Sequence, residues 1–225
     1  MGLFDWLPWL TKHSRLPIGV WPDEASRYDA LAAGVADDLR RGAHVLLVAH
    51  FPATLVALGE RLAAKGVAFE TRAEWSDAAA RKLVVSKEPT AVALLAAALP
   101  PLRDREEIVR QELMAGSRTL SFRIVDLHLL AAANDRVENY ARSLPCAVRL
   151  STSVALDGPL LRELAAPWLR DLLGKLGLRD GASIEDAMVT RSLRQALQKL
   201  ARRVTGDAPA DSLAAWLQQN LRRGR

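Results

Sequence analysis

Short apolar runs alternate with longer amphipathic runs over residues 23–157, and this alternation limits the folds open to the chain. The clearest apolar run is Ala43–Ala49, AHVLLVA, which has turn-forming residues on both sides. A short, continuous, β-branched run is typical of a strand buried on both faces of a parallel sheet. The run is preceded by a predicted helix that Asp23 can cap and Gly42 can end, and it is followed by a predicted helix over Pro52–Lys65. Strands that alternate with helices predict an α/β fold with a mainly parallel sheet flanked by helices.

The same patterns predict the remaining elements and divide the chain into three parts. Further strands are expected at Val67–Glu70, Lys82–Ser86, Thr119–Leu127 and Ala147–Val154, and further helices at Thr90–Leu99 and Asn134–Leu144. After Asp157 three helical stretches are expected, at Pro159–Leu176, Ser183–Val204 and Asp211–Arg222. The segment before Asp23 is rich in Trp and Pro and is expected to be irregular. The predicted organisation is an arm (1–22), an α/β domain (23–157) and a helical extension (158–225).

The net charge of +5 comes from the end of the chain. Residues 191–225 hold 8 basic and 2 acidic residues, whereas residues 1–190 hold 23 basic and 24 acidic ones. A basic tail of this kind makes nucleic acid a conceivable partner. Stacking of bases usually needs several aromatic residues, and Trp216 is the only one in this tail. Nucleic-acid binding is therefore the less favoured alternative to a protein partner or self-association.

The sequence shows no expected targeting segment and has a single cysteine. The longest uncharged apolar stretch, Pro89–Leu102, is too short for a bilayer, where about 20 residues are needed. Asp5 interrupts the apolar residues near the N-terminus, so no signal peptide is expected. Cys146 is the only cysteine, which excludes a disulfide framework and a thiolate metal cluster within the chain. A cytoplasmic protein without a transmembrane segment, metal or cofactor is expected.

Motifs for nucleotide chemistry are missing. The chain has no G-x-x-x-x-G-K-[ST] sequence, because Gly174-Lys175 is followed by Leu176, and it has no G-x-G-x-x-G sequence. Asp126 and His128 lie two positions apart on a predicted strand and would share a face, as an acid–base pair would. The alternative, which we favour, is that they make local hydrogen bonds at a strand end. No catalytic residue is therefore assigned.

Several segments, in order along the chain, resemble the second nucleotide-binding domain of the SecA preprotein translocase ATPase. They are HVLLVAHFPATLVALGERLAAKGVAFE, then His128, then Arg136-Val137-Glu138-Asn139 and Arg142 against the family's R-I-D-N-Q-L-R, then Leu156-Asp157 with Leu160-Leu161, and finally Asp186–Val204. The resemblance implies a RecA/helicase-like, helicase C-terminal-like fold. It also implies that His128, Arg136, Asn139 and Arg142 are the remnant of a motor motif.

The departures from the family bear on activity. Two family arginines in the G-R-x-G-R stretch, which would reach the γ-phosphate, are replaced by Leu144 and Ala147. Loss of such an arginine typically costs orders of magnitude in rate. The family's Gly-rich M-A-G-R-G-T-D loop is replaced by Lys82–Val92, and the partner motor domain with the P-loop does not occur in this sequence. The resemblance thus implies a pseudo-ATPase that acts as a protein-interaction or accessory module related to protein translocation. The alternative is a nucleic-acid-binding helicase-like remnant.

Five large apolar residues lie within seven positions of the N-terminal arm. They are Phe4, Trp6, Leu7, Trp9 and Leu10. Burying each such side chain is worth roughly 1.5–3 kcal/mol, so we expect the arm to pack against a surface. It can fold back on its own domain, dock on a partner or a second copy, or lie on a membrane surface, and the last is disfavoured by a proline within the arm. These five residues are the candidate partner-binding residues.

Overall fold

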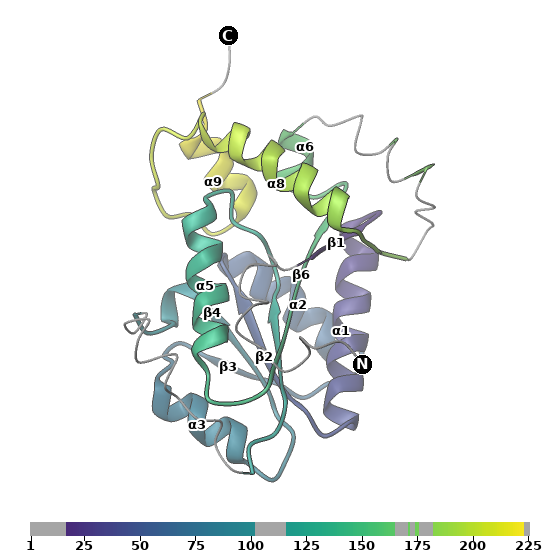
Figure 1. The fold of residues 1–225 in the computed structure, drawn as a ribbon, viewed down its shortest axis with the longest axis vertical. Helices are drawn as coiled ribbons and strands as arrows, with labels where there is room; N and C mark the ends of the chain where they lie inside the picture. Colours follow the sequence, from purple (N-terminus) through teal and green to yellow (C-terminus); the bar gives the residue numbers. More distant parts are fainter. Residues whose placement is uncertain (1–16, 102–115, 165–170, 172–173, 176–181, 223–225) are drawn as a thin grey trace, which may run out of the picture.

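Seven strands form one mainly parallel sheet in the order β3-β4-β2-β5-β6-β1-β7. The computed structural model describes residues 17–101, 116–164, 171, 174–175 and 182–222 (Figure 1). The strands are β1 (Ile18–Trp21), β2 (His44–Ala49), β3 (Glu70–Arg72), β4 (Ala91–Leu95), β5 (Leu120–Ile124), β6 (Val148–Ala155) and β7 (Ile184–Glu185). All neighbouring strands pair in parallel except β7, which runs antiparallel to β1. The predicted α/β class with a mainly parallel sheet is confirmed.

Helices cover both faces of the sheet, and the side chains of β2 show how. Val45 and Leu47 belong to the cluster that packs under α1 (Glu24–Arg40) and α2 (Pro52–Ala64). Leu46 belongs to the opposite cluster, under α3 (Asp77–Val85) and α5 (Ala131–Ser143). Alternate residues of a strand point to opposite faces. Because both faces of β2 are buried, its residues from Val45 to Ala49 are all apolar, in agreement with the predicted buried strand.

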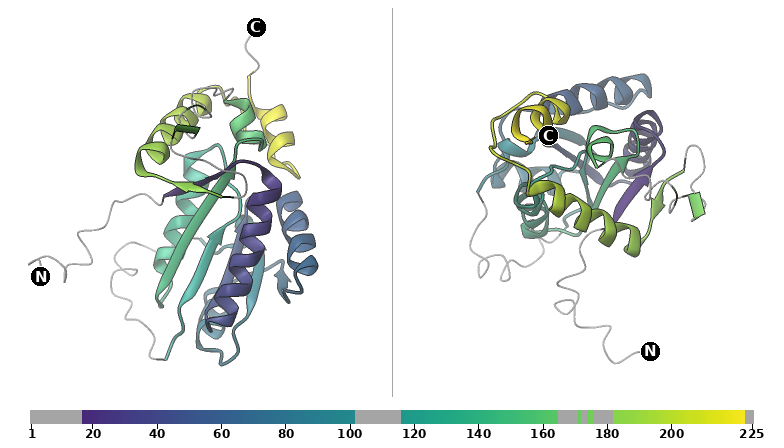
Figure 2. Two further views of the ribbon diagram at one scale, coloured as in Figure 1. Left: turned by 90° about the vertical axis from the view of Figure 1, so that its right-hand side faces the viewer. Right: turned by 90° about the horizontal axis from the view of Figure 1, so that it is seen from above.

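A third apolar cluster covers the carboxyl ends of the strands. It is built from α6 (Pro159–Glu163), α8 (Ala187–Ala201) and α9 (Leu213–Asn220), together with residues of β1 and of the loops that follow β2 and β5. Figure 2 shows these three helices grouped at one end of the sheet. The inward face of α8 carries the buried side chains Leu193, Leu197 and Leu200, which recur at the three- and four-residue spacing of one helix face.

Two neighbouring elements have the opposite type to the one predicted. Lys82–Ser86 was expected to be a strand, but most of it is the end of α3, whose start is capped by Ser76 accepting from the Ala79 backbone N–H. Thr90–Leu99 was expected to be a helix, but Ala91–Leu95 is β4, followed by a short 3-10 turn over Ala96–Ala98. Alanine is the strongest helix former, but helix propensity is a weak preference that tertiary contacts often override. The small alanine side chains of β4 fit the buried position between β2 and β3, and this tertiary packing decides the outcome.

The predicted arm and extension also need correction. Ile18–Trp21, expected to be irregular, is β1 and pairs with both β6 and β7. Residues 1–16 lie outside the described part of the chain. The stretch Ser183–Val204, expected to be a single helix, begins with β7, and α8 starts only after Asp186, whose carboxylate accepts from two backbone N–H groups of the first turn. Both short strands were missed because each is too short to show an alternating pattern.

Candidate functional site

The most informative place on the molecule is the point where the strand order reverses. From β2 the chain moves to β3 and β4 on one side of the sheet, and it then returns to β5 on the other side. In open α/β sheets, ligands usually bind in the crevice outside the carboxyl ends of the strands at such a point. Here this crevice is bordered by His50 and Phe51 after β2 and by Asp126 and His128 after β5.

The carboxylate of Asp126 lies at the start of α2. Its oxygens accept hydrogen bonds from the backbone N–H of His50 at 2.7 Å and from the hydroxyl of Thr54 at 2.6 Å. Burial raises the pKa of Asp126 above its ordinary value, and these hydrogen bonds oppose the rise. Helix N-termini are common binding sites for anionic ligands because their N–H groups are free. At α2 the chain's own carboxylate takes that position.

Aromatic rings fill the space beside Asp126. The His128 ring packs against Trp216 of α9 with centroids 4.6 Å apart, and it stacks on Phe51 at 5.4 Å. His50 lies 5.4 Å from His128 on another side. Burial lowers the pKa of both histidines to about 4, and for His128 the neighbouring His50 adds to the shift. Both rings are therefore neutral at pH 7.

The segment that carries α9 is fastened over this crevice by polar contacts. The backbone carbonyl of Asp211 accepts from the N–H of Ala53, in the first turn of α2, at 2.9 Å. The indole N–H of Trp216 donates to Asp207 at 2.9 Å, and Trp216 is only 1% exposed. A cavity of about 30 Å³ lies beside Asp126 and Arg27, and another of about 60 Å³ lies beside His128 and Asn134. Cavities of this size suit ordered water and are far too small for a nucleotide.

Asp126 and His128 do not form the acid–base pair that their spacing allowed. Asp126 binds the start of α2, whereas Nδ1 of His128 accepts from the backbone N–H of Leu130 at 3.1 Å. Asn134 completes this loop: its side chain accepts from the His128 N–H at 2.9 Å and donates to the His128 carbonyl at 2.7 Å. Local hydrogen bonds at a strand end, the favoured alternative, describe His128, whereas the partners of Asp126 lie 76 and 72 positions away in the sequence.

The four residues of the motor-motif remnant, His128, Arg136, Asn139 and Arg142, do not form a common site. His128 lies in the crevice, whereas the other three lie on α5. Arg136 donates to the carbonyl of Leu99 at 2.7 Å. Arg142 lies 3.3 Å from the buried carboxylate of Glu138, and Asn139 is half-buried.

The two positions that the resemblance assigns to lost arginines differ from each other. Leu144 is buried among the apolar residues between α5 and the sheet, whereas Ala147 is exposed just before β6. An arginine at position 144 would have to enter the core, so the leucine there serves the packing between α5 and the sheet.

Two residues of the crevice were not singled out as site residues from the sequence. Trp216 was noted only as a lone aromatic in the basic tail, and Asn134 only as the start of a helix. No local pattern shows that Trp216 reaches His128, because the contact joins distant parts of the chain. The five apolar residues of the arm lie outside the described residues, and their role stays a prediction.

The described residues contain no group of three or more His, Cys, Asp or Glu side chains that could hold a metal ion. None of their helices combines the length and the apolar character that crossing a membrane requires.

Comparison with known proteins gives no family. No family model matches the chain, and no curated protein matches it. Among solved structures, it is similar to the crystal structure of the C-terminal part of the Fun30 ATPase domain, with a TM-score of 0.40 and 12% sequence identity. The similarity covers 76% of this chain and 52% of that one, so this chain spans about half the length of that structure. Similarity at this level bears on neither activity nor partners.

Proposed function

We propose that this chain is a helicase C-terminal-like pseudo-ATPase domain, related to the second motor domain of SecA, that acts by binding other proteins. The observation that carries the proposal is the filled crevice at the carboxyl ends of β2 and β5. The Asp126 carboxylate holds the start of α2, and Trp216 packs on His128. A nucleotide would have to displace both a buried carboxylate and a buried tryptophan.

Loss of charge at the former arginine positions supports the same proposal. Phosphoryl transfer depends almost entirely on positioning and on stabilising negative charge. Leu144 and Ala147 supply no charge, and Arg136 and Arg142 are engaged with a carbonyl and a carboxylate of the chain itself. With no P-loop in the sequence either, the chain retains a scaffold without the groups that the reaction needs.

Calorimetry with ATP and magnesium tests the absence of nucleotide binding directly. We expect no heat of binding and no hydrolysis, because the crevice is filled and neither Gly-rich loop is present. A SecA motor protein under the same conditions is the positive control. A micromolar dissociation constant, or measurable phosphate release by this chain, would contradict the pseudo-ATPase proposal.

Nucleic-acid binding through the basic tail is the weaker candidate. Of the tail arginines, Arg194 is paired with Glu138 and Arg203 with Glu163. Trp216 is buried, so it offers no face on which a base can stack. Protein binding is therefore the class of function that we favour.

The N-terminal arm is one candidate contact for a partner, and its deletion tests this role. Removing residues 1–15 is expected to leave the free energy of unfolding within about 0.5 kcal/mol of the full chain, because partner docking does not contribute to the stability of a monomer. Self-association, if the partner is a second copy, should be lost in sedimentation measurements. A large fall in the stability of a monomer would show instead that the arm folds back on its own domain.

A further inference from the structure

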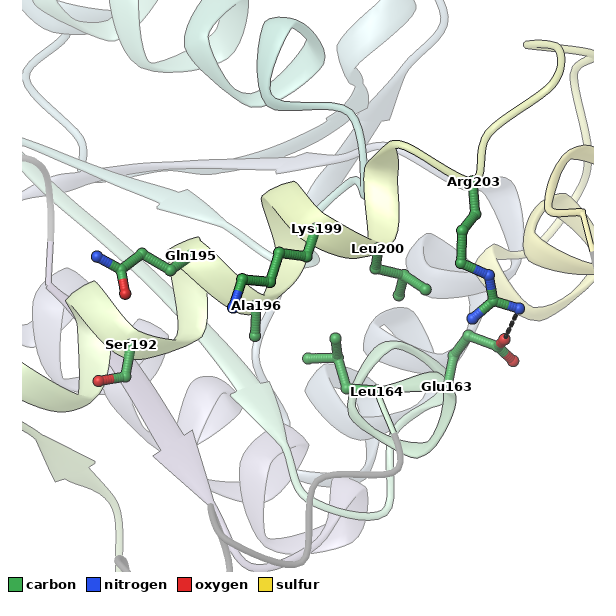
Figure 3. A pocket seen from close by; sticks show the side chains of 8 residues that line it. All are labelled: Glu163, Leu164, Ser192, Gln195, Ala196, Lys199, Leu200 and Arg203. Carbon is green, nitrogen blue, oxygen red and sulfur yellow. Dashed lines mark ion pairs between the residues drawn. The ribbon is translucent and has the colours of Figure 1, made fainter. Parts of the chain in front are cut away.

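A groove of about 480 Å³ lies between α6 and α8, next to the buried face of α8. Its floor is apolar and is formed by Leu164, Ala196 and Leu200. Figure 3 shows Leu164 and Leu200 facing each other across the floor, with the Glu163–Arg203 ion pair closing one end. The volume lies within the range of about 300–1,000 Å³ that is typical of binding pockets.

The groove has an excess of positive charge. Two cations, Lys199 and Arg203, and one carboxylate, Glu163, border it. The guanidinium of Arg203 lies 3.6 Å from Glu163 and donates to the backbone carbonyl of Arg222, so it is held in place. Lys199 is exposed and makes no ion pair within the part of the chain that the structure describes. Its charge is available to an incoming carboxylate.

An exposed methionine extends the same surface along α8. Met188 is 57% exposed, and among the described large hydrophobic residues only Val56 is more exposed. It lies four residues before Ser192, which lines the groove, and residues four apart share one face of a helix. From Met188 to Lys199 this face runs for about 16 Å at 1.5 Å per residue. A short helical or extended segment is long enough to cover it.

We propose that this groove binds an acidic amphipathic segment of a partner protein, an inference that rests on the interaction role proposed above. Apolar side chains of the segment pack on the floor and against Met188, while its carboxylates approach Lys199 and the outer side of Arg203. The apolar floor supplies affinity, and the cations select acidic segments over basic ones. Because these cations are exposed, binding should weaken as salt is added.

Two labelled synthetic peptides of the same length test the proposal on the full chain. One has Leu at helical spacing with Glu at the other positions, and the second has Lys in place of every Glu. In fluorescence anisotropy the Glu peptide is expected to bind and the Lys peptide is not. Lys199→Glu should weaken binding of the Glu peptide by about tenfold or more, since it turns attraction into repulsion.

Lys82→Glu is the matched control. Lys82 is exposed on α3, at the opposite end of the molecule from α8 (Figure 1), and does not line the groove, so the same substitution there should leave the affinity within about twofold. A third variant, Ala196→Trp, fills the floor and should abolish binding without any change of charge. Circular dichroism of each variant confirms that it is folded.

Four results would overturn the proposal. They are equal binding of the two peptides, an equal effect of Lys199→Glu and Lys82→Glu, and no binding of the Glu peptide up to about 1 mM, which corresponds to about −4 kcal/mol. The fourth is binding only after deletion of residues 165–181, which would mean that the chain's own segment occupies the groove. None of these results touches the calorimetry with ATP, so a failed groove and a failed pseudo-ATPase proposal are distinguished.

Discussion

The crevice at the carboxyl ends of the strands and the groove between α6 and α8 lie at the same end of the molecule, and α8 contributes to both. In the crevice, the rings of Trp216, Phe51 and two histidines pack closely. Burial lowers the pKa of these histidines, His50 and His128, to about 4. In the groove, Lys199 and Arg203 remain in contact with solvent above a shallow apolar floor. The usual ligand site of the fold is thus filled by the chain itself, and the open groove lies on α6 and α8, which belong to the apolar cluster that covers this end of the sheet.

Substitution of Trp216 tests whether the crevice is a packed core. Trp216→Ala is expected to lower the free energy of unfolding by about 3–5 kcal/mol, as for other large buried aromatic residues. It removes the contact with His128 and leaves Asp207 without its indole donor. Chemical denaturation measures the loss. Val56→Ala, at a position that is 63% exposed, is the control and should change stability by less than about 0.5 kcal/mol.

If Trp216→Ala lowers the free energy of unfolding only slightly, the crevice is loosely covered and does not differ from the open groove. Trp216→Phe sharpens the test further. Phe retains much of the buried area but not the hydrogen bond to Asp207, so its cost should lie between those of wild type and alanine.

The pH dependence of stability tests whether the crevice excludes water. His50 and His128 have pKa values of about 4 in the folded protein, against about 6.5 when exposed. The unfolded chain therefore binds more protons between these values, and the free energy of unfolding falls as the pH drops from 6.5 towards 4. Each histidine contributes roughly 3 kcal/mol at most. The raised pKa of Asp126 acts in the opposite direction and offsets part of this loss.

His50→Phe should flatten this profile. A phenyl ring fits beside Phe51 and His128, and it cannot take up a proton. Denaturation at several pH values should show a loss between pH 6.5 and 4 that is about half that of wild type, since one of two shifted histidines is gone. Parallel curves for the two proteins would show that His50 is solvated in the folded state.

The arginines in and just after α8 also differ in burial, as the crevice and the groove do. Helical spacing from Leu193, Leu197 and Leu200 predicts a solvated face for Arg194, Arg202 and Arg203. The Arg194 side chain is nevertheless only 17% exposed and lies 3.5 Å from the buried carboxylate of Glu138. Arg194→Ala should cost about 1–2 kcal/mol, because it leaves that carboxylate with one partner fewer. Arg202→Ala combined with Arg203→Ala should leave the melting temperature nearly unchanged, because exposed ion pairs contribute little. Equal melting temperatures for the two variants would remove the distinction.

The sequence predicted the elements whose pattern is local. Periodicity and a capping residue predict the helix that Asp23 caps and the inward face of α8. A short apolar run predicts the buried strand β2. The exchange of helix and strand around Ser86 was wrong because the alanines of β4 adopt the conformation that their neighbours β2 and β3 impose. The signal that could have corrected it is Ser76 followed by Asp77, a helix start that was not recognised.

The crevice was much harder to predict than the sheet. Asp126 and His128 were noted for their spacing, but their partners, Thr54 and Trp216, lie far away in the sequence. Whether a polar residue at a strand end binds a ligand or a neighbouring helix depends on contacts of this kind. Periodicity carries no information about them, so the local interpretation could be favoured but not established.

The position of β1 in the sheet also governs how the chain can acquire its fold during synthesis. Ile18 pairs with Thr152, and Val20 pairs with Ile184 on the other side. The first described strand to leave the ribosome therefore waits until most of the protein has been made before either neighbour exists. Contacts of such long range slow folding, and an unpaired strand is prone to aggregate in the meantime. A nascent chain that stops before β6 leaves Ile18–Trp21 without a partner strand, so chaperone dependence should be greatest for this intermediate length.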